Sequence, residues 1–77
     1  MRYSLTKKAE KQLLDVPAAI RRAFGKQVNL LVSNFRHPSL DAKRYKETNQ
    51  ARVNLSWRFY FDIEGDCYVI TRVCKHL

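Results

Sequence analysis

The sequence predicts an α+β fold in which two helices cover one face of an antiparallel β-sheet. In the first half of the chain, apolar residues recur every three or four positions, which is the period of a helix. In the last third they alternate with polar residues, which is the period of a strand. The 77 residues, 45% of them hydrophobic, suffice for one two-layer core, so we treat 1–77 as a single domain.

The first half is expected to form a strand followed by a helical hairpin. Residues 2–5 alternate over a short length, and Thr6 has the side chain of a helix N-cap. A helix is expected over about 7–15 and a second over about 17–35, because Pro17 has no N–H to lose at a helix start. The positions expected to face the core are Ala9, Leu13, Val16, Ile20, Phe24, Val28, Leu31 and Phe35.

The second half is expected to form the sheet. Pro38 disfavours helical geometry in the residue before it and so ends the second helix. Residues 43–46 could form a short edge strand whose cations discourage aggregation. Further strands are expected at 51–55, 58–63 and 67–74, with turns at Asn54-Leu55-Ser56 and Glu64-Gly65-Asp66.

The stretch from Arg52 onwards suggests a sheet with one apolar face and one basic face. Phe59, Phe61 and Ile63 alternate with Arg58, Tyr60 and Asp62, so the two sets are expected on opposite sides. Cys67 and Cys74 are seven positions apart in one expected strand, which predicts opposite faces and no disulfide between them.

The charge balance favours an anionic partner. Fifteen Lys and Arg against seven Asp and Glu give a formal net charge of +8, which attracts phosphate backbones or acidic protein surfaces. A membrane surface is less favoured, because no segment is a long basic amphipathic helix. The reduced cysteines and the lack of an apolar run long enough for a signal peptide or a membrane span predict a soluble, cytoplasmic protein.

The basic face with the histidine near its end is the strongest candidate site. Arginine offers a fork that fits phosphate oxygens, and histidine can take or give a proton near neutral pH. Such groups suit cleavage of a phosphodiester through the neighbouring 2′-hydroxyl, which needs no metal. From the residues alone, a solvated basic surface is the simpler interpretation. The residues of this face are Lys43, Lys46, Arg52, Arg58, Lys75 and His76.

Other chemistries have weaker support. Trp57, Tyr60 and Tyr68 could stack on unpaired bases, although such rings more often pack within the protein, and the four Phe are expected in the core. The histidines and cysteines show no paired spacing for a metal, and two glycines cannot form a Gly-rich phosphate loop. We therefore expect no metal site and no cofactor.

The strings ARVNLSWRFYF, EGD and VITRVCKH, in this order, resemble the RelE/ParE superfamily of toxins from type II toxin–antitoxin systems. The motifs are nearest to the HigB/RelE-like mRNA interferases, and the resemblance covers nearly the whole chain. It implies an N-terminal strand and a helical hairpin packed on a twisted antiparallel sheet, the RelE-like fold. It also implies a metal-independent endoribonuclease that cleaves mRNA on the ribosome, inhibits translation and is neutralised by a cognate antitoxin.

The resemblance also implies roles for particular residues. By position, Arg52 and Arg58 match phosphate-contacting arginines, and His76 matches the acid or base of the last strand. The chain departs from some members by stopping one residue after His76 and by carrying Cys74 in the last strand. A ParE-type inhibitor of DNA gyrase and a catalytically inactive, antitoxin-binding member therefore stay open as alternatives. The residues expected to bind RNA are Lys43, Lys46, Lys75, Arg72 and Trp57.

Overall fold

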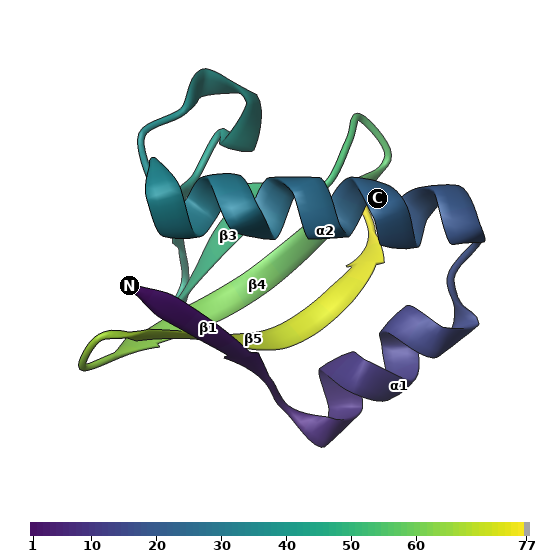
Figure 1. Ribbon diagram of the computed structural model, residues 1–77, viewed down its shortest axis with the longest axis horizontal. Coiled ribbons are helices and arrows are strands. Elements are labelled where there is room, and N and C mark those ends of the chain that lie inside the picture. Colours follow the sequence, from purple (N-terminus) through teal and green to yellow (C-terminus); the bar gives the residue numbers. More distant parts are fainter. Residues whose placement is uncertain (77) are drawn as a thin grey trace.

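The computed structural model describes residues 1–76 and consists of one five-stranded sheet with two α-helices. Figure 1 shows helix α2 lying across one face of the sheet and α1 lying beside it. The strand order is β1-β5-β4-β3-β2, with β4 at the centre. The elements are β1 (Arg2–Leu5), α1 (Lys7–Asp15), α2 (Ala18–Ser33), a 3₁₀ turn η1 (Pro38–Leu40), β2 (Lys43–Tyr45), β3 (Thr48–Arg52), β4 (Trp57–Glu64) and β5 (Cys67–Lys75).

The α+β prediction is confirmed, with one difference in the sheet. The pairs β2–β3, β3–β4 and β4–β5 are antiparallel, as expected. Strand β1 instead runs parallel to β5, with partners from Arg2 and Cys67 to Leu5 and Ile70. The first strand thus covers the outer edge of the last one, which would otherwise present unpaired backbone groups. The sheet is mixed rather than wholly antiparallel.

Both ends of α1 are closed by side chains. Thr6 is the predicted N-cap, and its hydroxyl accepts a hydrogen bond from the Ala9 N–H at 3.2 Å. At the other end, the guanidinium of Arg21 donates to the carbonyls of Leu13 at 3.0 Å and Val16 at 3.2 Å. A cation that serves the last carbonyls of a helix also complements the negative end of its dipole. Arg21 is therefore occupied by the connection between the helices.

The two helices do not form the close antiparallel pair that the sequence suggested. Helix α1 packs along β5, while α2 crosses the sheet (Figure 1). Beyond the end of β1, the Val73 N–H of β5 donates to Gln12 Oε1 of α1 at 2.8 Å, so α1 continues the protection of this edge. Neither helix within residues 1–76 is long and apolar enough to cross a membrane.

The core lies between α2 and the sheet. Phe24 of α2 meets Phe59 of β4 edge to face, with ring centres 5.4 Å apart. Phe35, predicted to belong to the core, is 38% exposed, because α2 ends at Ser33 and the chain turns away. Its ring stacks on Tyr68 at the margin of the core. The fully buried side chains include Val28, Leu31, Leu40, Phe59, Phe61 and Ile70.

A β-bulge at Thr71 reverses the side-chain alternation within β5. Tyr60 pairs with Arg72 and Phe61 with Ile70, so Thr71 has no partner on β4. Residues before and after the bulge therefore follow opposite parities. As a result Val73 joins the core, and Arg72 is placed on the other side of the sheet.

The bulge also corrects the prediction for the two cysteines. Cys67 pairs with Glu64 and Cys74 with Arg58, which lie on the same side of β4. The cysteines therefore share one face, because the bulge adds one residue between them. Both are free thiols. Their separation along β5 is about 20 Å, far beyond the reach of a disulfide.

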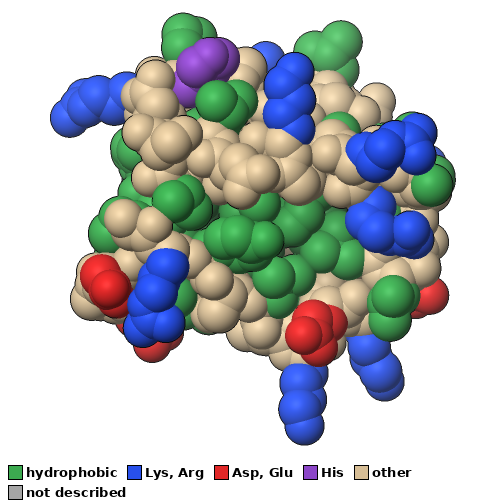
Figure 2. All heavy atoms as spheres, in the orientation of Figure 1, with side chains coloured by type: hydrophobic (Ala, Val, Ile, Leu, Met, Phe, Trp, Pro, Cys, Tyr) green, Lys and Arg blue, Asp and Glu red, His purple; other side chains and the backbone are tan. Residues whose placement is uncertain are grey.

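The α2 side of the molecule has an apolar area that α2 does not cover. Figure 2 shows apolar side chains gathered in the middle of this view, with cations mostly around its margin. The register aligns Ile63, Tyr68 and Tyr3 across β4, β5 and β1 on this side. Ile63 and Tyr3 are exposed, as is Phe35. Exposed apolar side chains gathered on one side of a molecule are typical of a surface that binds another protein.

Candidate functional site

The sheet side away from α2 carries the cations that the sequence analysis singled out. Arg52 of β3 pairs directly with Arg58 of β4, and Arg72 of β5 pairs with Tyr60 of β4. Side chains alternate along strands, so these three arginines lie on the same side, opposite the buried Phe59. We call this surface, with Lys43 of β2, the cationic face.

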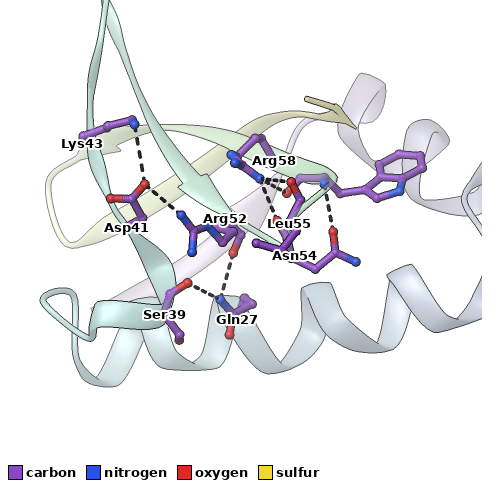
Figure 3. Close-up of polar contacts among 9 residues, drawn as sticks. Gln27, Ser39, Asp41, Lys43, Arg52, Asn54, Leu55 and Arg58 are labelled. Atoms are coloured by element: carbon purple, nitrogen blue, oxygen red, sulfur yellow. Dashed lines mark hydrogen bonds and ion pairs between the residues drawn. The ribbon is translucent and has the colours of Figure 1, made fainter. Parts of the chain in front are cut away.

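Arg52 is held in an ion pair with Asp41. Its Nη2 lies 3.3 Å from Asp41 Oδ2, and Lys43 Nζ lies 3.6 Å from the same oxygen (Figure 3). The buried Nε of Arg52 has no hydrogen-bond partner within the described chain. One carboxylate thus sits between two cations expected to contact RNA. A phosphate oxygen could take its place, because it offers the same negative charge and acceptor geometry.

The backbone of Arg52 is fixed from the opposite side of the sheet. Gln27 of α2, only 6% exposed, donates through Nε2 to the Arg52 carbonyl at 2.9 Å and to the Ser39 carbonyl at 3.2 Å (Figure 3). A buried amide that satisfies two carbonyls locks the ends of β3 and η1 against α2. This contact positions the Arg52 side chain at the sheet's end.

Arg58 closes the turn between β3 and β4. Its Nη1 donates to the carbonyls of Asn54 at 2.7 Å, Leu55 at 3.3 Å and Trp57 at 3.1 Å (Figure 3). The Asn54 side chain supports the same turn, since its Oδ1 accepts from the backbone N–H groups of Ser56 and Trp57. Arg58 therefore has a structural task, in addition to the phosphate contact expected for it.

Arg72 is an exposed cation supported by an aromatic ring. Its guanidinium carbon lies 4.3 Å from the ring centre of Tyr60, and the Tyr60 hydroxyl accepts from Gln50 Nε2 at 2.8 Å. Tyr60 is buried beneath Arg72, which leaves little of its ring for a base. The Tyr68 ring is also buried, on the α2 side of the sheet. Neither tyrosine provides the stacking surface suggested by the sequence.

His76 lies at the corner of the sheet that Arg58 closes. The backbone N–H of His76 donates to the Ser56 carbonyl at 2.7 Å, which extends the pairing of β4 and β5 by one residue beyond Lys75. The imidazole is exposed. Alternation along the strand puts its position on the side of Arg72 and Cys74. The structure thus brings His76 and Arg58 to the same turn, residues 53–56.

Three residues of the expected RNA-binding set lie apart from the three arginines. Trp57 and Lys75 are partners across β4 and β5 on the α2 side, with Lys75 Nζ 6.0 Å from the indole ring. They therefore point away from the cationic face. Lys46 lies in the turn between β2 and β3 with φ +55°, and its Nζ is 5.5 Å from the Tyr45 ring. The expected set does not form one continuous surface.

The cationic face is hollowed near the β2–β3 turn. An open concavity of about 1010 Å³ lies between this turn and the first turn of α1. Its lining includes Tyr45, Thr48, Tyr60, Asp62 and Arg72. Asp62 was predicted on the same side of its strand as Arg58 and Tyr60 but was assigned no role. An acid on an otherwise basic strand surface was the signal available for finding it.

A mixed five-stranded sheet with one helix-covered side and one cationic side defines an α+β fold known from solved structures. No family model matches the sequence, and no curated protein matches it significantly. The RelB–RelE antitoxin–toxin complex from Methanococcus jannaschii contains a similar chain, with a TM-score of 0.74 and 24% identity over 92% of this chain and 87% of that one.

Two further solved structures are similar. The YoeB/ParE toxin from Agrobacterium tumefaciens has a TM-score of 0.82 and 10% identity, and all of both chains is covered. YafQ from Escherichia coli has a TM-score of 0.72 and 14% identity over 96% of this chain and 91% of that one. These likenesses show that the chain has the RelE-like fold, which confirms the fold that the sequence motifs implied.

Proposed function

We propose that this protein is the toxin of a type II toxin–antitoxin pair and cleaves mRNA on the ribosome. The observation that carries the proposal is the placement of Arg52, Arg58 and Arg72 on one open side of a RelE-like sheet. The presence of toxins among the similar structures supports the toxin assignment. Inhibition of translation would follow from cleavage of the message, and the site of action would be the cytoplasm.

RNA binding would be largely electrostatic. The formal charge of +8 and the four cations of the cationic face suit a phosphate backbone. If all four each neutralise one phosphate of a single strand, the logarithm of the association constant should fall with the logarithm of salt concentration with a slope of about −3. A much shallower slope would indicate a different surface.

The cleavage chemistry would use the chain's own side chains. The 2′-oxygen attacks the adjacent phosphorus, the bond from phosphorus to the 5′-oxygen breaks, and a cyclic phosphate forms. One group must take the proton of the 2′-hydroxyl and another must protonate the leaving 5′-oxygen. His76 is the candidate for one of these transfers. Arg52 and Arg58 would stabilise the negative charge on the pentacoordinate phosphate, and no metal or cofactor enters the scheme.

The partner would be an antitoxin that covers two kinds of surface. A similar chain occurs in an antitoxin–toxin complex, which supports such a partner. The two surfaces lie on opposite sides of the sheet, so an acidic segment would match the cationic face and a separate amphipathic segment would match the exposed apolar area on the α2 side (Figure 2). Binding over the cationic face would exclude RNA and so neutralise the toxin.

Controlled expression in bacterial cells tests the proposal, with mRNA 5′ ends mapped after induction. The wild type should arrest growth and produce new 5′ ends, whereas His76→Ala should lose both effects. Lys75→Ala is the matched control, because this neighbouring cation points to the α2 side and its loss should leave cleavage intact. Equal cleavage by the wild type and His76→Ala would overturn the assigned acid or base.

The alternatives give different results in the same experiment. Supercoiling defects and DNA damage with intact mRNA would identify a gyrase inhibitor. Tight binding to the product of an adjacent gene, without any effect on growth, would identify an inactive antitoxin-binding member. Arg58 already donates hydrogen bonds to three carbonyls of its own turn, and this observation supports the inactive alternative.

A further inference from the structure

We propose that the concavity beside Tyr45 is a nucleobase subsite that selects bases with adjacent hydrogen-bond donors, guanine above all. This subsite deepens the proposed function and rests on it, because it takes RNA as the ligand. The concavity lies on the cationic face, and Arg72 lines it. The concavity has a volume of about 1010 Å³ and is open to solvent, so a base could enter it from the surface.

Tyr45 provides an available aromatic wall. It is 39% exposed, and its ring centre lies 5.6 Å from that of the buried Tyr60 at a tilt of 58°. Tyr60 is in turn held by Gln50, so Tyr45 rests on a fixed support. Lys46 Nζ lies 5.5 Å from the centre of the Tyr45 ring, so this flexible side chain would move aside when a base stacks on the braced ring. Stacking of this kind tolerates any base.

Asp62 provides the selective group. It is half-buried on β4, and the Thr48 hydroxyl lies 2.9 Å from its Oδ1 and so fixes the carboxylate. Asp62 is within 4.0 Å of no lysine or arginine nitrogen, and the same holds for Glu47, which also lines the concavity; the ion pairs among residues 1–76 involve only Asp41 and Asp66. A carboxylate without a cationic partner repels phosphate on a cationic surface. It can, however, accept hydrogen bonds from the N–H groups of a base, and we assign this function to Asp62.

The pattern of donors on each base decides the preference. The Watson–Crick edge of guanine carries N1–H and the N2 amino group side by side, which matches the two oxygens of a carboxylate. Adenine and cytosine each offer one amino group beside an acceptor, and uracil offers one N–H between two carbonyls. A carboxylate faces repulsion from these acceptors. Guanine should therefore bind best and uracil worst.

Cations at the rim would hold the sugar-phosphate chain of the same nucleotide. Arg72 borders the concavity on the side of the cationic face, and Lys8 and Lys46 line it near α1 and the β2–β3 turn. A base stacked on Tyr45 with its edge toward Asp62 would leave its phosphates near these side chains. The subsite would thus choose which residue of the RNA lies next to the cleavage position.

Equilibrium binding to short 2′-O-methyl RNA tests the subsite without any cleavage. The probes are fluorescent hexamers of uridine with one central guanosine or one central inosine, which lacks the N2 amino group. The wild type should bind the guanosine probe about tenfold more tightly. Asp62→Asn should abolish this ratio, whereas Glu64→Gln, which removes the same charge from the same strand, should retain it. Tyr45→Ala should weaken both probes by about 5- to 100-fold.

Each outcome bears on one claim. Equal affinity of the wild type for the two probes, or an unchanged ratio in Asp62→Asn, would overturn the subsite. A circular dichroism spectrum and thermal midpoint identical to the wild type would show that Asp62→Asn is folded. Cleavage of mRNA with no base preference in binding would leave the nuclease standing without this subsite. A guanosine preference with no cleavage would overturn the nuclease alone.

Discussion

Replacement of Arg58 by alanine should destabilise the protein more than the same replacement of Arg72. The two arginines occupy adjacent strands of the cationic face, and either could be read as a phosphate contact. Their surroundings differ. Arg58 Nη1 donates to three carbonyls of the β3–β4 turn, whereas Arg72 lies over the Tyr60 ring.

The expected magnitudes follow from these contacts. The bonds to Asn54 at 2.7 Å and Trp57 at 3.1 Å are well within hydrogen-bonding range, while the one to Leu55 at 3.3 Å is weak. A hydrogen bond with a charged donor contributes about 1.5–3 kcal/mol when buried, and partial exposure here reduces the total for Arg58→Ala to about 1–2 kcal/mol. An exposed cation–π contact such as that of Arg72 contributes about 0.5–1 kcal/mol.

Thermal and urea unfolding would measure the difference. In a domain of this size each kcal/mol shifts the melting temperature by about 4–8 °C, so Arg58→Ala should melt about 5–15 °C below the wild type. Arg72→Ala should fall by at most about half as much. The urea m-value should stay constant in both variants, which would show that the midpoints report stability.

Equal stability of the two variants, or a melting temperature of Arg58→Ala equal to that of the wild type, would contradict this prediction. Water would then satisfy the turn carbonyls, and Arg58 would be available to phosphate without a structural penalty. If the prediction holds, a loss of toxicity in Arg58→Ala has two explanations. Cleavage should then be compared at a temperature where that variant remains fully folded.

Four other substitutions probe the backbone, the core and the site. Gly25→Ala should stabilise α2 by about 0.5–1 kcal/mol in urea unfolding, because a Cβ there meets nothing within 4 Å. Gly65→Ala should cost about 1–2 kcal/mol in the same assay, since its φ of +60° is left-handed. Gln27→Leu should cost about 1–3 kcal/mol, because two carbonyls lose their donor. Asp41→Asn should tighten single-stranded RNA binding by about two- to fivefold in fluorescence anisotropy, as two cations are released.

The outcomes that contradict these predictions are specific. Destabilisation by Gly25→Ala together with no loss of stability in Gly65→Ala would mean that the turn, and not the helix, tolerates a side chain. Unchanged stability of Gln27→Leu would show that water replaces its amide. Asp66→Asn is the control for Asp41→Asn, because Asp66 pairs with Arg2 at a distant turn. Equal tightening in both would indicate a general charge effect.

The order and type of most elements could be read from the residues. The predicted Thr6 cap, the two helices, the edge strand and the turn at Gly65 are all present. Each depends on contacts between residues close in the chain, which local periodicity and capping chemistry describe well. The basic side of β4 was predictable for the same reason, since alternation within one strand is a local property.

The site needed information that no single segment contains. In β5, Tyr68, Ile70 and Val73 all face the core, which a strand with regular alternation does not allow. The bulge at Thr71 that makes this possible depends on pairing with β4. The hydrogen-bond partners of the Arg58 and Arg52 side chains likewise lie in connecting segments, and the alternation of residue types along a strand does not predict the shape of such segments.

Local sequence order is thus sufficient for a RelE-like succession of elements and for a basic strand surface, because neighbouring residues dictate helix, strand and turn. The composition of the cationic face depended on the assembled sheet. The bulge moved Arg72 onto it, strand pairing set Trp57 and Lys75 on the opposite side, and the β2–β3 hairpin brought Tyr45 to the same concavity as Asp62. Such juxtapositions join residues far apart in the chain, so packing and register, not local preference, select them.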